Sequence, residues 1–356
     1  MKVIGRHPWF SPMRRFSRID FAMLMATAAL AACSGVAADN DAAGHGKGRS
    51  FGGQYGVMAG DPTLFVAAGD YRMYYSCYAT DIGGTDICLA TSSDGLHWQM
   101  PKIDDGPTHG RVLFATRKGW DGAHETPEAI RVGNETWLYV VAYADARTGF
   151  FNNKSHLALA RSGDGLHFNM DDQAVLSPQP GGADDHGITS PTVIRDAHGW
   201  SLVYTGWCLD ASVCPRAASG RFTTLLGATS SDGLHWTRKT TPLIEDSALP
   251  AWASSGIAET HVVRAEPGQW ALLFTALSGD APKSIGIATG PGPFGPWTIE
   301  AAPLLPGAEI RSWADKGPVA PHGTIEGSRL RMWYAGEDSH GPAFRIGYAE
   351  FPWPRH

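Results

Sequence analysis

The stretch Thr91-Ser-Ser-Asp-Gly-Leu-His-Trp98 decides the fold, because it occurs three times in this chain. It returns as Arg161-Ser-Gly-Asp-Gly-Leu-His-Phe168 and as Thr229-Ser-Ser-Asp-Gly-Leu-His-Trp236. The Asp residues of the three copies are 70 and 68 residues apart. A period of that length belongs to a supersecondary unit and not to a whole domain, so the stretch marks an internal repeat.

Each copy is preceded by two runs that predict β-strands. The nearer run is short and apolar and ends in Ala, at 87–90, 157–160 and 225–228. The farther run is rich in aromatic and β-branched residues, at 72–78, 137–143 and 200–207. The Asp-Gly pair then predicts a tight turn, and its His (His97, His167 and His235) is expected to be structural because it recurs with the turn.

Two weaker copies complete the set. Aromatic runs at 269–275 and 329–334 lead to apolar runs at 284–288 and 344–349. Five units of about four antiparallel strands each predict an all-β chain, folded as a five-bladed β-propeller over residues 51–356.

The N-terminus carries the pattern of an export signal. Arg14, Arg15 and Arg18 precede an apolar run at 21–32 that is too short to span a membrane. We expect residues 1–32 to be a signal peptide and residues 33–50, which are rich in Gly, Ala, Asp and Asn, to be a flexible tether.

Leu30-Ala-Ala-Cys33 resembles the cleavage site of bacterial lipoproteins, which implies that Cys33 carries lipid. Ser34 in place of Asp implies sorting to the outer membrane. The expected location is therefore the periplasmic face of the outer membrane or the cell surface, with lipid as the only membrane contact. The alternative is an ordinary cleavage site beside an incidental Cys.

Charge argues against two classes of partner. The whole chain has a formal net charge of −6, and the export signal holds five basic residues and one acidic residue. Its removal makes the chain four charges more negative. Nucleic acid and anionic lipid headgroups are therefore not expected as partners.

The four remaining cysteines form two local pairs. Cys77 and Cys88 fall on the second and third predicted strands of the first blade, and Cys208 and Cys214 close a short loop after the third blade's second strand. Disulfides of this kind suit an oxidising periplasm. A metal site would need further His or Cys partners at ligand spacing, which the sequence does not show.

The strand before each aromatic run is expected to be innermost, with its first residues lining a central pocket. Aligned on the apolar pair that follows, the five strand starts place at one level Asp61, Thr126, Ser190, Glu259 and Pro321. Glu125 stands one residue before Thr126. Three carboxylates from different blades are thus expected at one pocket, although any single one could equally be solvated or cap a loop.

Such a set suits the hydrolysis of a glycosidic bond. That reaction uses two carboxyl groups, one protonated to assist the leaving group and one ionised as base or nucleophile. Repulsion between carboxylates in a partly dry pocket raises the pKa of one of them.

The five repeats, the Asp61-Pro62 start and the recurring Asp-Gly-Leu-His turn resemble the five-bladed glycosidase superfamily over roughly residues 55–353. This superfamily includes glycoside hydrolase families 43, 32, 62, 68, 117 and 130. The resemblance implies that Asp61 is the base or nucleophile and that Glu125 tunes a pKa or orients the substrate. In blade three, families 43 and 32 carry the acid Glu where this chain has Thr189-Ser190-Pro191, so Glu259 becomes the candidate acid.

Further candidates for substrate binding are His124, Asp185, His322 and Trp207, while His186 and His261 also stand at strand starts. His322 has three open roles: binding substrate hydroxyls, holding an ion at the propeller axis as in some family 43 members, or packing in the core. No cofactor is expected to be required, although the resemblance leaves open a structural calcium ion at the axis. Trp207 is a candidate sugar platform, and Arg147, Phe150 and Asn152 fall in an insertion that is a candidate cover for the pocket.

The leading hypothesis is a glycoside hydrolase acting on a furanose-type or related oligosaccharide. One alternative is a non-catalytic glycan-binding or polysaccharide-assembly lipoprotein, motivated by the missing acid in blade three. Another is a glycoside phosphorylase, which needs a basic cluster for phosphate, whereas Arg131, Arg195 and Arg264 are expected at the opposite end of the inner strands. A sialidase is disfavoured because no three-arginine clamp is evident.

Overall fold

The computed structural model describes residues 49–51, 58–67, 69–79, 84–103, 110–116, 119–145, 149–266, 268–279, 281–340 and 344–354. All of them belong to Ala37–His356, one of two compact units into which the chain divides. The predicted signal peptide, Cys33, most of the tether and Arg147 lie outside the described residues. Within the described ranges, no helix is long and apolar enough to cross a membrane.

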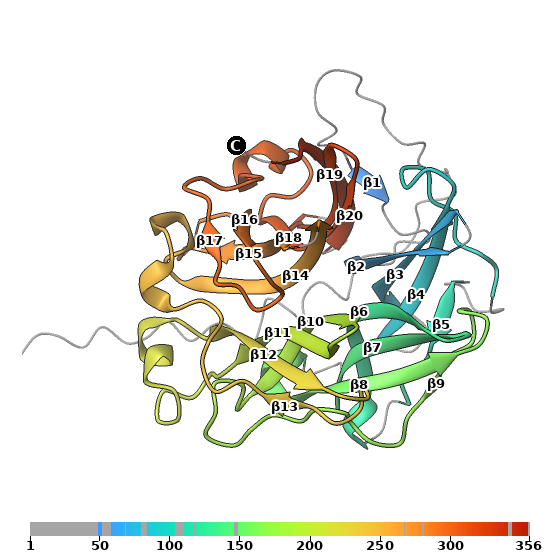
Figure 1. Cartoon of the computed structure of the whole chain (residues 1–356), viewed down its shortest axis with the longest axis horizontal. Helices are drawn as coiled ribbons and strands as arrows, with labels where there is room; N and C mark the ends of the chain where they lie inside the picture. The colour runs from blue at the N-terminus through green and yellow to red at the C-terminus, as the bar shows by residue number, and fades with distance from the viewer. Residues whose placement is uncertain are drawn as a thin grey trace, which may run out of the picture. The chain divides into compact units, whose positions relative to one another are not determined.

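The described residues form antiparallel sheets with short 3-10 turns and no α-helix, so the prediction of an all-β chain is confirmed (Figure 1). Their strands group into five four-stranded units. The first contains β2 (Ala59–Ala67), β3 (Asp70–Ala79), β4 (Gly84–Ser92) and β5 (Arg111–Leu113). The second contains β6 (Ala123–Val132), β7 (Glu135–Tyr143), β8 (Ser155–Ser162) and β9 (Asn169–Met170).

The other three units follow the same order. The third contains β10 (Gly187–Asp196), β11 (Gly199–Trp207), β12 (Thr223–Ser230) and β13 (Thr237–Arg238). The fourth contains β14 (Gly256–Glu266), β15 (Gln269–Leu277), β16 (Ser284–Gly290) and β17 (Thr298–Ile299). The fifth contains β18 (Gly317–Glu326), β19 (Arg329–Glu337), β20 (Phe344–Pro352) and β1 (Arg49–Phe51).

Two features join strands that are distant in the sequence. β1 pairs with β20 and thereby completes the fifth unit, so this strand spans the predicted boundary between tether and domain. The second and third units share one sheet through a single parallel bridge between Ser155 and Gly187. No described sheet closes on itself.

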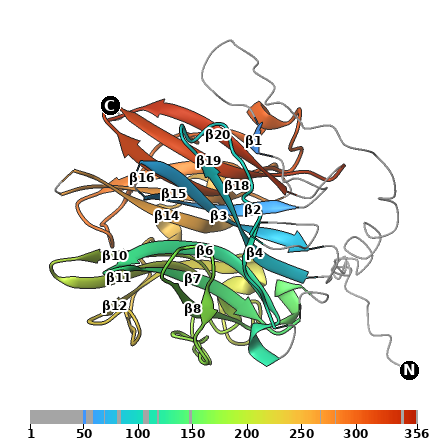
Figure 2. The same cartoon turned by 90° about the vertical axis from the view of Figure 1, so that its right-hand side faces the viewer.

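The first strands of the units contact one another in a circle. β2 contacts β6, β6 contacts β10, β10 contacts β14, β14 contacts β18, and β18 contacts β2. Figure 1 shows these strands nearest the centre, with β5, β9, β13 and β17 at the periphery. Figure 2 shows β2 to β4 between the sheets that contain β18 to β20 and β6 to β8.

The hydrophobic core lies between successive units. Tyr74 of the first unit packs in one cluster with Leu138 of the second, and Tyr139 of the second packs in another with Leu202 of the third. The same arrangement joins the last unit to the first, where Trp333 lies in a cluster with Tyr75. Burying each of these side chains stabilises the fold by about 2–3 kcal/mol.

The repeated turn is built by its Asp. Asp94 Oδ1 accepts hydrogen bonds from the backbone N–H groups of Leu96 and His97, both at 2.8 Å, and Oδ2 lies 2.6 Å from His97 Nδ1. Asp164 and Asp232 make the same contacts in their copies. The three His side chains are largely exposed and contact their own turn, which is the structural role that their recurrence predicted.

Each repeated turn is also hydrogen-bonded to a neighbouring unit. The carbonyls of Gly165 and Gly233 accept hydrogen bonds from the hydroxyls of Tyr74 and Tyr139, each at 2.9 Å. The carbonyl of Gly95 accepts one from Trp333 Nε1, also at 2.9 Å. Because Trp333 lies in the fifth unit, the turn of the first unit joins the two ends of the repeat.

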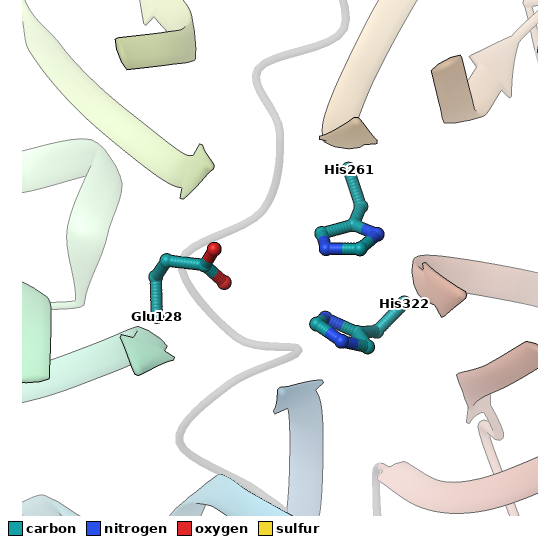
Figure 3. A group of neighbouring side chains, drawn as sticks. All are labelled: Glu128, His261 and His322. Carbon is teal, nitrogen blue, oxygen red and sulfur yellow. The ribbon is translucent and has the colours of Figure 1, made fainter. Parts of the chain in front are cut away.

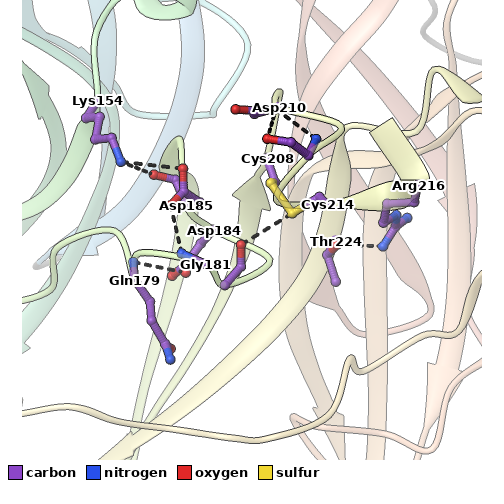
Figure 4. Close-up of a disulfide and its surroundings, with 12 residues drawn as sticks. Lys154, Gln179, Gly181, Asp184, Asp185, Cys208, Asp210, Cys214, Arg216 and Thr224 are labelled. Carbon is purple, nitrogen blue, oxygen red and sulfur yellow. Dashed lines mark hydrogen bonds and ion pairs between the residues drawn. A yellow bond between two sulfur atoms is a disulfide. The ribbon is translucent and has the colours of Figure 1, made fainter. Parts of the chain in front are cut away.

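Both predicted disulfides are present. Cys77–Cys88 links β3 to β4 with a Cα–Cα distance of 5.8 Å, and Cys208–Cys214 closes the loop after β11 with a Cα–Cα distance of 6.2 Å. Figure 4 shows the second bond, where Cys214 also lies 3.4 Å from the carbonyl of Gly182.

Candidate active site

The first strand of every unit contains one residue with left-handed backbone. These are Asp61, Thr126, Ser190, Glu259 and Ala320, with φ between 46° and 49°. Such angles are strained for any residue but glycine, and recurrence in five units shows that the geometry belongs to the fold. Four of the five match the alignment made from sequence. The fifth is Ala320 and not Pro321, because proline is held near φ −65° and cannot adopt this conformation.

The left-handed residue interrupts strand pairing, and regular register resumes two residues later at Thr63, Glu128, Thr192, His261 and His322. We call the left-handed residues the upper ring and these five residues the lower ring. Members of both rings line one cavity of about 30 Å³. Asp61 and Glu259 are the carboxylates that the upper ring contributes.

Asp61 is held by a hydroxyl from the second strand of its own unit. Its Oδ2 accepts a hydrogen bond of 2.7 Å from Ser76 Oγ, which itself accepts one of 2.9 Å from the backbone N–H of Thr126. Burial, helped by the negative charge of Glu125, raises the pKa of Asp61 to about 6. This carboxyl is therefore ionised for most of the time at neutral pH.

Glu259 has an equivalent support. Its Oε2 accepts hydrogen bonds from Thr275 Oγ1 at 2.8 Å and from the backbone N–H of Ala320 at 3.2 Å. Burial is the largest cause that raises the pKa of Glu259 to about 7, with Asp61 acting in the same direction and Lys283 opposing it. At neutral pH this carboxyl is protonated for about half of the time.

Glu125 lies beside the cavity but does not line it. Its Oε1 accepts a hydrogen bond of 2.6 Å from the Tyr143 hydroxyl and one of 3.3 Å from Thr85 Oγ1. Burial raises the pKa of Glu125, and its charge acts on Asp61. The structure thus brings the three predicted carboxylates together, with two of them facing the cavity.

The lower ring hydrogen-bonds each unit to the next. Glu128 Oε1 accepts from the Val193 N–H at 3.3 Å, Thr192 Oγ1 from the Val262 N–H at 3.2 Å, and His261 Nδ1 from the Gly323 N–H at 3.2 Å. His322 is hydrogen-bonded to the backbone of Leu64. Burial raises the pKa of Glu128 to about 8 and lowers that of His261 to about 3, so both groups are mainly neutral at pH 7.

Glu128, His261 and His322 form the one buried group of metal-ligating side chains in the described residues, with ligand atoms within 4.8 Å of one another. Figure 3 shows the carboxyl of Glu128 facing the two imidazoles. Calcium takes six to eight oxygen ligands, water included, and the protein oxygens in this group are those of Glu128, which already accept hydrogen bonds from Thr63 and Val193. A structural calcium ion at the axis stays a prediction.

A zinc-type ion suits imidazole better, but the two histidines are already engaged. The Gly323 N–H donates a hydrogen bond to Nδ1 of His261, so the proton of this neutral imidazole is on Nε2. Neither ring nitrogen of His261 then has a free lone pair for a metal ion. We describe the lower ring as a hydrogen-bonded floor of the cavity. His322 belongs to this floor.

The other predicted substrate-binding residues do not line the cavity. His124 is fully buried on β6. Asp185 lies in the loop before β10. It accepts a hydrogen bond of 2.8 Å from the Gly181 N–H and contacts Lys154 (Figure 4). Trp207 ends β11 and donates from Nε1 to Thr189 Oγ1 at 2.8 Å, one residue from the upper ring.

Sequence reasoning missed Glu128 and the hydroxyls that support the carboxylates. Glu128 could have been found by its spacing, two residues after Thr126, as His261 is after Glu259. The hydroxyls follow an aromatic residue in second strands, as in Tyr75-Ser76 and Phe274-Thr275.

Solved structures that resemble this chain are glycoside hydrolases. A thermostable family-43 glycoside hydrolase matches with a TM-score of 0.62 at 17% identity, over 85% of this chain and 92% of its own. An endo-arabinase from Bacteroides thetaiotaomicron matches with a TM-score of 0.59 at 14% identity, over 86% and 98%. An alpha-L-arabinofuranosidase from Lactobacillus brevis matches with a TM-score of 0.58 at 14% identity, over 85% and 93%.

No protein-family model and no curated protein matches the sequence. At identities below one fifth, the structural likeness concerns the fold. The chain has the fold of these glycoside hydrolases.

Proposed function

We propose that this chain is a glycoside hydrolase folded as a five-bladed propeller, in which each four-stranded unit is one blade. The observation that carries the proposal is the pair of carboxyl groups, Asp61 and Glu259, that line one cavity with pKa values raised to about 6 and about 7. Two carboxyls with separated pKa values supply the acid and the ionised partner that glycoside hydrolysis requires.

In this mechanism Glu259 is the general acid, because it has the higher pKa and protonates the oxygen of the leaving sugar. Asp61, with the lower pKa, is the ionised group that activates water or attacks the anomeric carbon. Glu125 does not touch the substrate and acts as a positioning residue, since its charge adds to the effect of burial in raising the pKa of Asp61. The reaction uses no step through a metal or other cofactor.

The substrate proposed is a furanose-type or related oligosaccharide, or the end of a polysaccharide. Support comes from the structural relatives, which include an endo-arabinase, an alpha-L-arabinofuranosidase and an endo-1,4-beta-xylanase. We also propose that the enzyme is exported and anchored through lipid at Cys33, facing the periplasm or the cell exterior. The N-terminal sequence and the two disulfides support this location.

The experiment is release of reducing sugar by the purified protein from arabino-, xylo-, fructo-, galacto- and manno-oligosaccharides, with Asp61→Asn as the matched variant. The wild type should release sugar from at least one of these classes of oligosaccharide, and this activity should persist when a chelator is added. Asp61→Asn should have no activity. An Asp61→Asn protein that remains fully active would remove Asp61 from the mechanism.

One observation favours a non-catalytic glycan-binding protein as the second candidate, namely Ser190 at the upper-ring position of the third unit, where a catalytic Glu was expected. This candidate would be supported if the wild type hydrolysed none of the glycans and an Asp61→Asn/Glu259→Gln double variant bound a glycan as tightly as the wild type does. A phosphorylase is less well supported, because the cavity lining contains neither Arg nor Lys among the described residues. Arg195 and Arg264 instead stack on Trp200 and Trp270 at the far ends of their strands.

A further inference from the structure

Four aromatic side chains gather on the side of the second and third units. Phe150 and Phe151 come from the 3-10 turn η4 (Phe150–Asn152), His186 precedes β10, and Trp207 ends β11. The centroid of the Trp207 indole lies 5.4 Å from that of Phe150 and 5.7 Å from that of Phe151, with interplanar angles of 68° and 81°. Phe150 also lies edge-on to His186 at 5.3 Å. We call these four residues the aromatic shelf.

The shelf adjoins the cavity. Strand register places Trp207 opposite Gly187, so the end of β11 lies beside the start of β10, where the upper-ring residue Ser190 stands. The hydrogen bond from Trp207 Nε1 to Thr189 Oγ1 connects the indole to the residue before Ser190. The shelf therefore begins one residue away from the cavity wall.

The shelf is held in place by polar contacts on both sides. Asn153 Nδ2 donates to the carbonyls of Gly149 at 2.7 Å and Asp145 at 3.0 Å, which closes the loop behind the two phenylalanines. His186 Nε2 lies 3.1 Å from the carbonyl of Phe150. Lys154 Nζ donates to the carbonyl of Asp185 at 2.8 Å, as Figure 4 shows. A surface so fixed can bind a ligand without first losing conformational freedom.

Exposure separates the two phenylalanines. Phe150, which contacts Trp207 and His186, is partly buried and anchors the turn, whereas Phe151 leaves 62% of its surface exposed. A purely structural anchor would not need the second ring. Near the shelf, the Ser190 hydroxyl is buried and has no hydrogen-bond partner among the described residues. An aromatic face and an unused hydroxyl thus lie on the same side of the cavity.

We propose that the aromatic shelf binds a second sugar ring of the oligosaccharide whose scissile bond lies over Asp61 and Glu259. This proposal rests on the function proposed above and assigns the direction in which the glycan leaves the cavity. The C–H face of a sugar stacks on the exposed ring of Phe151, which Trp207 supports nearly at a right angle, because aromatic rings offer a large rigid apolar surface beside polar groups that fix orientation.

The test compares substrates that reach the shelf with substrates that do not. In Phe151→Ala, kcat/KM for arabino- and xylotriose should fall about tenfold, mainly through KM, while kcat/KM for the 4-nitrophenyl glycosides of single arabinofuranose and xylose units stays unchanged. Phe151→Tyr, which keeps the ring, should restore the trisaccharide values. The matched control is Phe114→Ala, which removes an exposed ring beyond the outer strand β5.

The binding arm uses Asp61→Asn, so that no substrate is consumed. Titration calorimetry with the two trisaccharides should show weaker binding after Phe151→Ala is added and unchanged binding after Phe114→Ala. Equal trisaccharide affinity and kcat/KM in Phe151→Ala and wild type would overturn the shelf while leaving the hydrolase intact. Binding that depends on Phe151 without any turnover would keep the shelf and overturn the hydrolase. A protein that neither binds nor cleaves these trisaccharides contradicts both.

Discussion

At the scale of single residues, the left-handed backbone decides where the chemistry lies. Ala320 adopts the same φ as Asp61 and Glu259 although it has no functional side chain. The strain is therefore a property of the strand start in every unit, and the side chain placed there is free to vary. Carboxylates at two of the five positions, Asp61 and Glu259, distinguish this cavity from a centre that is filled only by packed side chains.

The pKa values predict a narrow pH range for activity. Asp61 must be ionised, so activity is lost as pH falls through about 6, and Glu259 must be protonated, so activity is lost as pH rises through about 7. The profile of kcat/KM against pH should be bell-shaped with its maximum between these values. A flat profile from pH 5 to 8 would contradict the assignment of the two carboxyls.

Glu125→Gln should move the acid limb of that profile. The negative charge of Glu125 contributes to the raised pKa of Asp61, so its removal lowers that pKa and extends activity to lower pH. Because the charges of Glu125 and Glu259 also repel each other, the limb set by Glu259 should move to lower pH as well. An acid limb that stays in place would show that Glu125 does not act through Asp61.

Glu259→Gln should distinguish the role of the general acid, Glu259, from the role of the ionised carboxylate, Asp61. Loss of a general acid costs roughly 10²–10⁴ in rate with a natural sugar leaving group, but little with a leaving group that departs without a proton. The measurement is kcat/KM on a trisaccharide and on the 2,4-dinitrophenyl glycoside of the same sugar, with Asp61→Asn for comparison. Asp61→Asn should be inactive on both, and equal losses in the two variants would contradict the assigned roles.

At the scale of elements, the repeated turn acts as a connector between neighbouring units. Trp333→Phe should lower the free energy of unfolding by about 1–3 kcal/mol, because it removes the donor to the buried Gly95 carbonyl. The matched control is Trp137→Phe, since Trp137 Nε1 contacts the exposed Glu135 and should change stability much less. Urea denaturation of the two variants measures the difference, and equal stabilities would show that the bond to Gly95 contributes nothing.

Much of this arrangement follows from the sequence, for identifiable reasons. The strands and the turn were predicted because their residue types repeat, and the cysteine pairs because they stand on neighbouring segments. Four members of the upper ring could be aligned because an apolar pair follows each strand start, whereas the fifth was misplaced by one residue at Pro321. Glu128 was missed although its spacing after Thr126 equals that of His261 after Glu259, because the alignment considered only one residue in each strand start. Trp207 and Phe150 were each named from the sequence as pocket candidates, but their contact was not predicted, because they are 57 residues apart and a single sequence does not show that their segments meet.

At the scale of the whole molecule, the two disulfides predict dependence on an oxidising compartment. Removing the Cys77–Cys88 bond by a Cys77→Ala/Cys88→Ala double change should lower the free energy of unfolding by about 3 kcal/mol. Thermal denaturation of the oxidised wild type and the double variant measures the loss. Unchanged stability would show that the strand ladder between β3 and β4 suffices alone.

The proposed lipid anchor has its own test. Cys33→Ser should abolish incorporation of labelled palmitate in growing cells and move the protein from the membrane fraction to the soluble fraction of the periplasm. The folded unit lies at Ala37–His356 and should keep its thermal stability. Labelling that persists in Cys33→Ser would place the modification elsewhere.

One sheet of the fold depends on β1, a strand of three residues that comes before the other strands in the sequence. It covers the open edge of β20, the last long strand of the chain. A version beginning after residue 51 would leave that edge free, and a free sheet edge recruits strands from other molecules. Such a truncated protein should form dimers or aggregates in which the exposed β20 edges of different molecules pair with one another. Anyone shortening this protein for crystallisation should therefore cut before Arg49.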